Sequence, residues 1–178
     1  MFPSPLSPYA VQKLTGEMYN KTYHDNFGLR TTSLRYFNVY GPNQDPNSEY
    51  SAVVPIFIRQ ALSNKPLTIF GDGKTSRDFT FIEDVIQANL CAVLSESADG
   101  HTVNVAYGDS CTLTDLAYHI IDITKSESEI VFVSERKGDV KHSLADLSKT
   151  KDLLGYKPEY NLKKGLEKTV QFYKDNMQ

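Results

Sequence analysis

Apolar residues recur along the chain at two spacings, which predict where its helices and strands lie. Residues 8–26 carry apolar side chains three and four positions apart, the repeat of one face of an α-helix, at Val11, Leu14 and Met18. Ser7 is a favourable residue for capping the start of this helix, and Gly28 is a stop signal at its end. The pattern therefore predicts a helix over 8–26.

The rest of the chain alternates between short apolar runs and longer amphipathic segments. The short runs predict strands over 31–37, 67–70, 101–106 and 130–133. The amphipathic segments predict helices over 51–63, 84–95, 113–125, 143–153 and 162–176. Turn-forming residues predict a loop over 41–47. This alternation indicates an α/β fold, and because no repeat or linker interrupts it, we take 1–178 as a single unit.

The composition restricts the kinds of partner. A net charge of −3 leaves no basic stripe for neutralising nucleic-acid phosphates, and no apolar run approaches the roughly 20 residues of a membrane span. The four histidines are scattered, so we expect no metal site. Cys91 and Cys111 are isolated, and the start of the chain is not typical of a secretory signal. We therefore expect reduced core thiols in a cytoplasmic protein.

The ten glycines do not form a dinucleotide-binding turn. None of them builds a G-x-x-G-x-x-G or G-x-G-x-x-G pattern that opens a helix after a strand. The predicted strands are also too few for a complete doubly wound sheet. The sequence therefore lacks the helix start that holds the diphosphate of a dinucleotide.

Tyr9 and Lys13 form the first candidate for chemistry. Their spacing of four places a phenol and an ammonium group on one face of the predicted helix. A nearby positive charge favours the phenolate and lowers the tyrosine pKa from its ordinary value near 10, which suits a general base at neutral pH. As a bare pattern, the pair is weak evidence, and a tyrosine and a lysine on a solvated helix face are the more common arrangement.

Four blocks in order give this pair a context. They are S-P-Y-A-V-Q-K over 7–13, L-R-Y-F-N-V-Y-G-P over 34–42, G-D-G-K-T-S-R-D-F over 71–79 with E-D-V over 83–85, and R-K-G-D-V over 136–140 with A-D over 145–146. Together they resemble the extended short-chain dehydrogenase/reductases, the NAD-dependent epimerases and dehydratases of nucleotide sugars. The resemblance covers essentially the whole chain and matches the second half of a family member. It implies the C-terminal part of a Rossmann-type doubly wound fold, with a small substrate-binding α/β subdomain and without the glycine-rich N-terminal half.

The resemblance also implies roles at the cofactor side of a site. Tyr9 would be the catalytic base, and Lys13 would bind the nicotinamide ribose of NAD. Tyr36, Phe37 and Asn38 would lie beside the nicotinamide and the sugar diphosphate. Because the phosphate-binding turn is missing, we expect NAD to bind the complete enzyme and to bind this chain alone weakly or not at all.

On the substrate side, Arg77 and Arg136 resemble the pair that binds the diphosphate of a UDP-sugar. Guanidinium groups suit phosphate oxygens because they donate two parallel hydrogen bonds. Asp139 resembles the carboxylate that accepts the uridine ribose hydroxyls, and the strand from Thr68 to Phe70 resembles the one whose backbone pairs with uracil. Each arginine could instead form only a surface salt bridge.

The family reaction implied is 4-epimerisation of a UDP-sugar. Three alternatives remain open for this chain: part of an epimerase that is inactive alone, a UDP-sugar-binding remnant without turnover, or half of a split enzyme with a separate Rossmann half. UDP-glucuronate epimerases and decarboxylases and dTDP-glucose dehydratases share the same blocks. Family members also pair as homodimers through two helices, one of which would be the helix of Tyr9 and Lys13, so apolar surface is expected to be exposed here.

Ser143 suggests which sugar. In this family the seventh residue after the arginine at 136 lies beside the 2- and 4-positions of the sugar, where a tyrosine is typical of enzymes limited to UDP-glucose and UDP-galactose. A serine leaves space for a 2-acetamido group, which favours UDP-N-acetylglucosamine and UDP-N-acetylgalactosamine. The residues at 44–47 and 50–55 also resemble UDP-N-acetylglucosamine 4-epimerases. Alternatively, Ser143 caps the helix predicted over 144–153.

Overall fold

A computed structural model describes residues 3–45, 52–135 and 140–176. Its helices are α1 (Pro8–Phe27), α2 (Val53–Leu62), α3 (Ile82–Leu94), α4 (Leu113–Thr124), α5 (Ser148–Leu154) and α6 (Leu162–Asn176). Its strands are β1 (Thr32–Tyr36), β2 (Val39–Tyr40), β3 (Leu67–Phe70), β4 (Ser76–Arg77), β5 (Thr80–Phe81), β6 (His101–Val105), β7 (Cys111–Thr112) and β8 (Ile130–Val133). The predicted α/β fold is confirmed.

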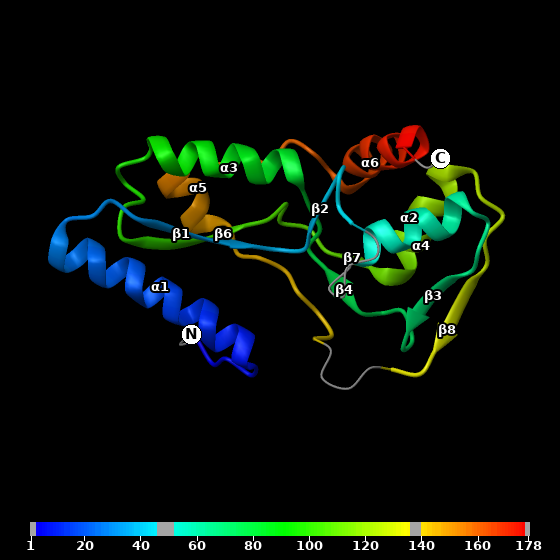
Figure 1. Cartoon of the computed structure of the whole chain (residues 1–178), viewed down its shortest axis with the longest axis horizontal. Coiled ribbons are helices and arrows are strands. Elements are labelled where there is room, and N and C mark those ends of the chain that lie inside the picture. The colour runs from blue at the N-terminus through cyan, green and yellow to red at the C-terminus, as the bar shows by residue number, and fades with distance from the viewer. Residues whose placement is uncertain (1–2, 46–51, 136–139, 177–178) are drawn as a thin grey trace.

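The elements form two groups that lie side by side (Figure 1). In the first group, β1 pairs in parallel with β6 from Thr32 opposite His101 to Tyr36 opposite Val105. Helix α1 lies on one side of this pair, and α3 with α5 lies on the other. A buried apolar cluster fills the space on the α3 and α5 side and includes Val103, Ala88 and Tyr156.

The second group combines the parallel pair β3 and β8 with helices α2, α4 and α6. Each helix buries one apolar face, and the three faces meet in one cluster with Phe57, Leu116 and Leu166 at its centre. The regular helical spacing of these residues explains why the helices could be predicted from the sequence.

Helix α1 is attached to its strand by polar contacts. Its start is capped as predicted, since the Ser7 hydroxyl accepts a hydrogen bond from the Ala10 amide at 3.2 Å. The Arg35 guanidinium on β1 donates to both carboxylate oxygens of Glu17 at 2.6 and 2.5 Å. None of the helix's residues is buried, and Met18 on its apolar face is 60% exposed. The described part of the chain therefore leaves this face uncovered, as expected for a pairing surface.

A fully buried carboxylate, that of Asp78, ties three separate segments together. One oxygen accepts from the Tyr107 amide at 3.1 Å, and the other accepts from the amides of Gly108 and Ala145 at 3.1 and 3.2 Å. Burial raises the pKa of Asp78 above its ordinary value, while the same three amides favour its charged form. The carboxylate thus fixes the turn after β6 and the chain before α5 against the β4–β5 segment.

The helix predicted over 143–153 is shorter than expected. Helix α5 begins only at Ser148 with Leu147 as its cap residue, so the interpretation of Ser143 as a helix cap is wrong. The physical reason is that the preceding backbone is already engaged elsewhere. The Ser143 amide donates to the Ser76 carbonyl at 3.1 Å, and the Ala145 amide donates to Asp78, which holds this segment extended.

Several short elements were not predicted. Strands β2, β4, β5 and β7 have two residues each, which is too short for an alternating pattern to register. The strand predicted over 31–37 ends at Tyr36, and the helix predicted from 51 begins at Val53 among the described residues. The boundaries of the long elements otherwise follow the apolar pattern closely.

Among the described residues, no helix has both the length and the apolar character needed to cross a membrane. The same part of the chain brings no three His, Cys, Asp or Glu side chains into an arrangement that would hold a metal ion. Cys91 and Cys111 are free thiols as predicted, but both are half-buried rather than fully in the core. Burial raises the pKa of the Cys111 thiol to about 12.

We expect Asp78→Ala to destabilise the protein by about 3 kcal/mol or more, because each buried amide left without an acceptor costs roughly 1–3 kcal/mol. Urea denaturation monitored by circular dichroism measures the free energy of unfolding. The matched control is Asp109→Ala, since Asp109 is exposed in the same region and should change stability by less than about 1 kcal/mol. Equal stability of the two variants would show that Asp78 is not the anchor.

Candidate functional site

The first part of the candidate site is a groove between α1 and β1, with a volume of about 960 Å³. Tyr9, Lys13 and Tyr36 line it, as do the residues of the Glu17–Arg35 ion pair. The Lys13 ammonium lies 5.3 Å from the centre of the Tyr9 ring, so the predicted pair does share one helix face. Tyr9 is 69% exposed, which leaves its hydroxyl accessible to a ligand in the groove.

Tyr36 stands at the carboxyl end of β1, where the strand stops. Its hydroxyl donates to the Asn89 side chain of α3 at 3.0 Å. That contact turns the hydroxyl towards α3 and leaves the half-exposed ring beside the groove. The arrangement favours an aromatic surface for a flat ligand over an acid–base role for this phenol.

The chain changes direction directly after Tyr36. Phe37 donates its amide to the Val105 carbonyl at 3.0 Å, and its ring packs half-buried against the apolar cluster of the first group. Asn38 follows with a backbone φ of 28°, a conformation that favours glycine or asparagine. The exposed Asn38 side chain lines a second hollow. Of these two predicted site residues, Phe37 therefore packs against the core and Asn38 lines a hollow.

The second hollow, which we call the α2–β3 pocket, has a volume of about 540 Å³. Four residues predicted to bind substrate line it, namely Asn38, Thr68, Phe70 and Arg77. Four residues of α2 also line it, at positions 53, 56, 57 and 60. These four residues were not among the predicted site residues, although their spacing of three, four and seven is that of one helix face.

Arg77 brings a positive charge to the α2–β3 pocket. Strand β4 holds it in place by antiparallel pairing with β7, in which Arg77 lies opposite Cys111. Its guanidinium donates to the Ser76 carbonyl at 2.9 Å and more weakly to the Lys141 carbonyl at 3.4 Å. These contacts orient the guanidinium at the wall of the pocket.

Ser143 lies next to Arg77 through the backbone. Its amide donates to the Ser76 carbonyl, which is the same oxygen that accepts from Arg77. The neighbouring His142 ring nitrogen is 3.0 Å from the Ser76 hydroxyl. Ser143 is half-buried and lies four residues after the segment 136–139. The predicted residues Arg136 and Asp139 are in that segment, which is outside the described residues.

The structure therefore divides the predicted residues between two hollows. Tyr9, Lys13 and Tyr36 lie in the groove beside α1. Asn38, Thr68, Phe70 and Arg77 line the α2–β3 pocket, with Ser143 beside Arg77. Asn38 follows Tyr36 by only two residues and so joins the two hollows. A ligand spanning both would place its anionic part near Arg77 and its reacting part near Tyr9.

We expect Asn38→Ala to lower the free energy of unfolding by about 1 kcal/mol, because a residue with a side chain other than Asn or Asp is strained at a positive φ. Asn38→Gly should cost less, since glycine adopts this conformation without strain. Thermal unfolding followed by calorimetry compares the two variants. If Asn38→Gly is the less stable, the asparagine is kept at this position for its side-chain contacts and not for its backbone.

Comparison with known proteins finds one matching family and several similar proteins. The model of the NAD dependent epimerase/dehydratase family matches residues 1–106. An uncharacterized UDP-glucose epimerase of Bacillus subtilis is 38% identical over 95% of this chain and 52% of its own length. The chain thus spans about half the length of the curated relatives it matches.

Two solved structures are also similar. The UDP-glucose 4-epimerase of Thermotoga maritima with UDP-glucose has a TM-score of 0.94 and 38% identity, over 99% of this chain and 56% of that one. The UDP-N-acetylglucosamine 4-epimerase of Methanobrevibacter ruminantium in complex with UDP-N-acetylmuramic acid has a TM-score of 0.92 and 40% identity, over 98% of this chain and 56% of that one. The likeness extends over essentially all of the described fold and over part of those Rossmann-type enzymes.

Proposed function

The chain belongs to the NAD dependent epimerase/dehydratase family, and from that premise we propose that it is the substrate-binding part of a nucleotide-sugar 4-epimerase. The proposed substrates are UDP-N-acetylglucosamine and UDP-N-acetylgalactosamine. The observation that carries the proposal is the α2–β3 pocket, because it gathers Asn38, Thr68, Phe70 and Arg77 next to the groove of Tyr9 and Lys13. Solved 4-epimerases with 38% and 40% identity support it.

The two hollows suit two parts of one ligand. The α2–β3 pocket would take the UDP moiety, with the Arg77 guanidinium on the diphosphate, because charge-assisted contacts to phosphate are among the strongest hydrogen bonds. The groove would take the sugar and the nicotinamide ribose. Arg136 and Asp139 lie outside the described residues. We propose Arg136 as a second contact to the diphosphate and Asp139 as the contact to the uridine ribose.

The groove also fits the nicotinamide end of NAD, because it offers a lysine, two tyrosines and enough space. When bound, the cofactor supplies reversible hydride transfer at the sugar C4. The Tyr9 phenol oxygen would take up the proton of the sugar 4-hydroxyl and return it, and the Lys13 ammonium would hold the ribose. The glycine-rich turn for the remainder of the cofactor is not in this sequence, so a Rossmann half must provide it.

Helix α1 is the proposed place where further polypeptide joins. Its exposed apolar side chains, among them Val11, Met18 and Tyr19, are typical of a surface that another helix covers. We propose that the complete enzyme is a homodimer formed in part through this helix. Binding without turnover would instead indicate a UDP-sugar-binding remnant, and activity only with a separate chain would indicate a split enzyme.

A chimera tests the proposed chemistry. It joins the N-terminal half of the Thermotoga maritima UDP-glucose 4-epimerase to this chain, and epimerisation of each UDP-sugar pair is followed by NMR. We expect turnover in the chimera and none in the chain alone. Tyr9→Phe should lower kcat roughly 10²–10⁴-fold, because it removes the general base.

The matched control for Tyr9 is Tyr19→Phe, since Tyr19 is an equally exposed tyrosine of the same helix, at 62% against 69%. It should retain the kcat of the unsubstituted chimera. Unchanged turnover in Tyr9→Phe would reject Tyr9 as the base.

The choice of sugar is tested at Ser143 in the same chimera. Ser143→Tyr should fill the space for the 2-acetamido group and shift the ratio of kcat/KM towards UDP-glucose by at least about tenfold, because the tyrosine ring would clash with that substituent and not with a 2-hydroxyl. Ser143→Ala is the control, because it keeps the space and should preserve the preference. A ratio that Ser143→Tyr leaves unaltered would reduce the assignment to an unspecified UDP-hexose.

A further inference from the structure

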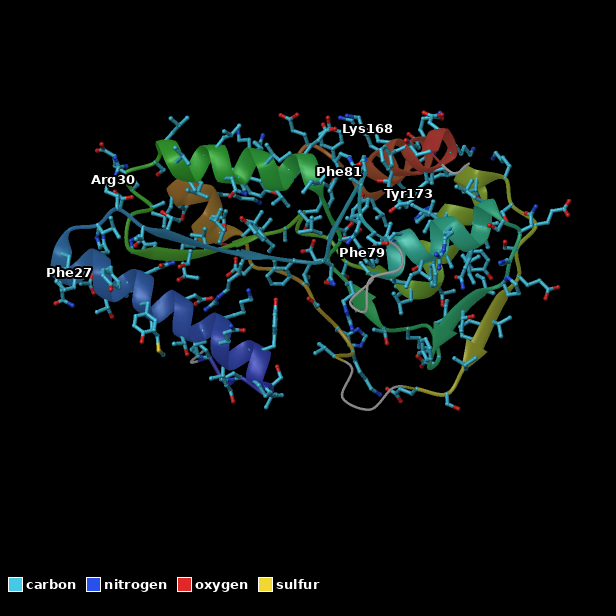
Figure 2. All side chains as sticks on the ribbon, in the orientation of Figure 1. Phe27, Arg30, Phe79, Phe81, Lys168 and Tyr173 are labelled. Carbon is cyan, nitrogen blue, oxygen red and sulfur yellow. The ribbon has the colours of Figure 1, made fainter. Side chains whose placement is uncertain are left out.

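Strand β4 has a neighbour on each of its two sides. On one side it pairs with β7, and on the other side Ser76 forms a parallel bridge with His142. The strand lies where the two groups of elements meet (Figure 1), and Figure 2 labels Phe79 and Phe81, which follow it closely in the chain. Strand β4 therefore links the extended segment 141–145 to β7.

Ser76 is the residue of β4 at which these contacts converge. Its amide donates to the Lys141 carbonyl at 2.9 Å, and its carbonyl accepts from the Ser143 amide at 3.1 Å. The same carbonyl accepts from the Arg77 guanidinium, which also donates to the Lys141 carbonyl. The residue proposed for the diphosphate and the residue proposed beside the sugar thus meet at one main-chain unit.

His142 adds a side-chain contact to this bridge. Its ring Nδ1 lies 3.0 Å from the Ser76 hydroxyl, at hydrogen-bonding distance, and Ser76 is only 9% exposed. A bridge of one residue pair has few main-chain hydrogen bonds, so the backbone alone specifies its register weakly. The contact between ring and hydroxyl fixes that register, because a shift by one residue would bring Lys141 or Ser143 opposite Ser76.

The segment 141–145 is held at a second point by Asp78, which accepts from the Ala145 amide at 3.2 Å. Ser76 and Asp78 are two residues apart in extended chain, so their side chains point to the same side. Arg77 stands between them and points to the opposite side, where it lines the α2–β3 pocket. The two side chains that hold the segment therefore flank the guanidinium in sequence.

The His142 ring itself lies outside the pocket. Among the described residues, those that line the α2–β3 pocket include Arg77 but not His142, which lines a separate hollow with Glu135 and Lys141. The ring can therefore affect a ligand in the pocket through Ser76 and Arg77, without touching that ligand.

We propose that His142 is a positioning residue, which through Ser76 holds the Arg77 guanidinium towards the diphosphate and Ser143 beside the sugar. This rests on the proposed function, in which Arg77 binds the diphosphate of a UDP-sugar. When the ring contact is present, the acceptor carbonyls that orient the guanidinium are fixed before the ligand arrives. Without it, binding must also order the guanidinium, and that ordering lowers affinity.

Isothermal titration calorimetry of the chain with UDP, together with NMR titration with uridine, tests the proposal. His142→Leu removes the ring nitrogen and should weaken UDP binding about fivefold, the scale of one net hydrogen bond. Uridine carries no phosphate for the guanidinium, so its affinity should stay unchanged. A role of His142 in folding alone would weaken the binding of both ligands alike.

Conservative variants separate the contact from the loss of the ring. His142→Asn places an amide at the position of Nδ1, where it can bond to the Ser76 hydroxyl, and should retain the UDP affinity of the unsubstituted chain. His142→Gln carries the amide one bond further out and should behave like His142→Leu. Ser76→Ala removes the other partner, so the double variant Ser76→Ala, His142→Leu should weaken UDP binding no more than either substitution alone.

His119→Leu is the matched control, because His119 is an exposed histidine of α4 that lines a different hollow. It should leave UDP affinity unchanged. Equal losses of UDP and uridine affinity in His142→Leu would show a structural role and overturn the proposal. Failure of His142→Asn to retain UDP affinity would overturn it as well.

Arg77→Ala separates this inference from the proposed function. If Arg77→Ala weakens UDP binding and His142→Leu does not, the positioning role is wrong while the contact to the diphosphate stands. If the unsubstituted chain binds neither ligand, or binds UDP no more tightly than uridine, the proposed role of Arg77 fails, and the inference fails with it.

Discussion

The buried carboxylate of Asp78 is the contact on which the geometry of the candidate site depends. It comes directly after Arg77 in the chain, and it holds the amides of Tyr107, Gly108 and Ala145. The backbone next to Arg77 and the extended segment that contains Ser143 are therefore held by the same group. Because three distant segments meet at one carboxylate, Arg77 and Ser143 are held in a fixed relation to one another.

The walls of the two hollows are held in place by different interactions, apolar packing in one and polar contacts in the other. The α2–β3 pocket is built into an apolar core, so its shape is set before any ligand arrives. The groove depends on the polar attachment of α1, chiefly the Glu17–Arg35 pair, and that helix has no buried residue. The proposed nucleotide pocket thus lies in the packed part of the molecule, whereas Tyr9 and Lys13 lie on a helix that polar contacts attach to the rest.

Buried polar groups in this fold differ in whether other groups of the chain donate hydrogen bonds to them. The Asp84 carboxylate is buried and accepts from the amides of Glu159 and Tyr160, so its hydrogen bonds are made within the chain and it serves folding. The Gln60 oxygen is buried in the wall of a pocket without such a donor among the described residues. A buried polar group that is hydrogen-bonded within the protein supports the fold, whereas one without a partner lowers its stability.

The sequence by itself determined the long helices and strands, the α/β class and the Tyr9–Lys13 pair, because apolar periodicity and the four-residue helical spacing are local properties. It could not determine where α5 begins, since the amides before that helix are engaged by Ser76 and Asp78 from distant parts of the chain. Nor could it show that α2 lines the α2–β3 pocket. Only tertiary structure decided which side chains face one pocket, because this depends on contacts between residues far apart in the chain.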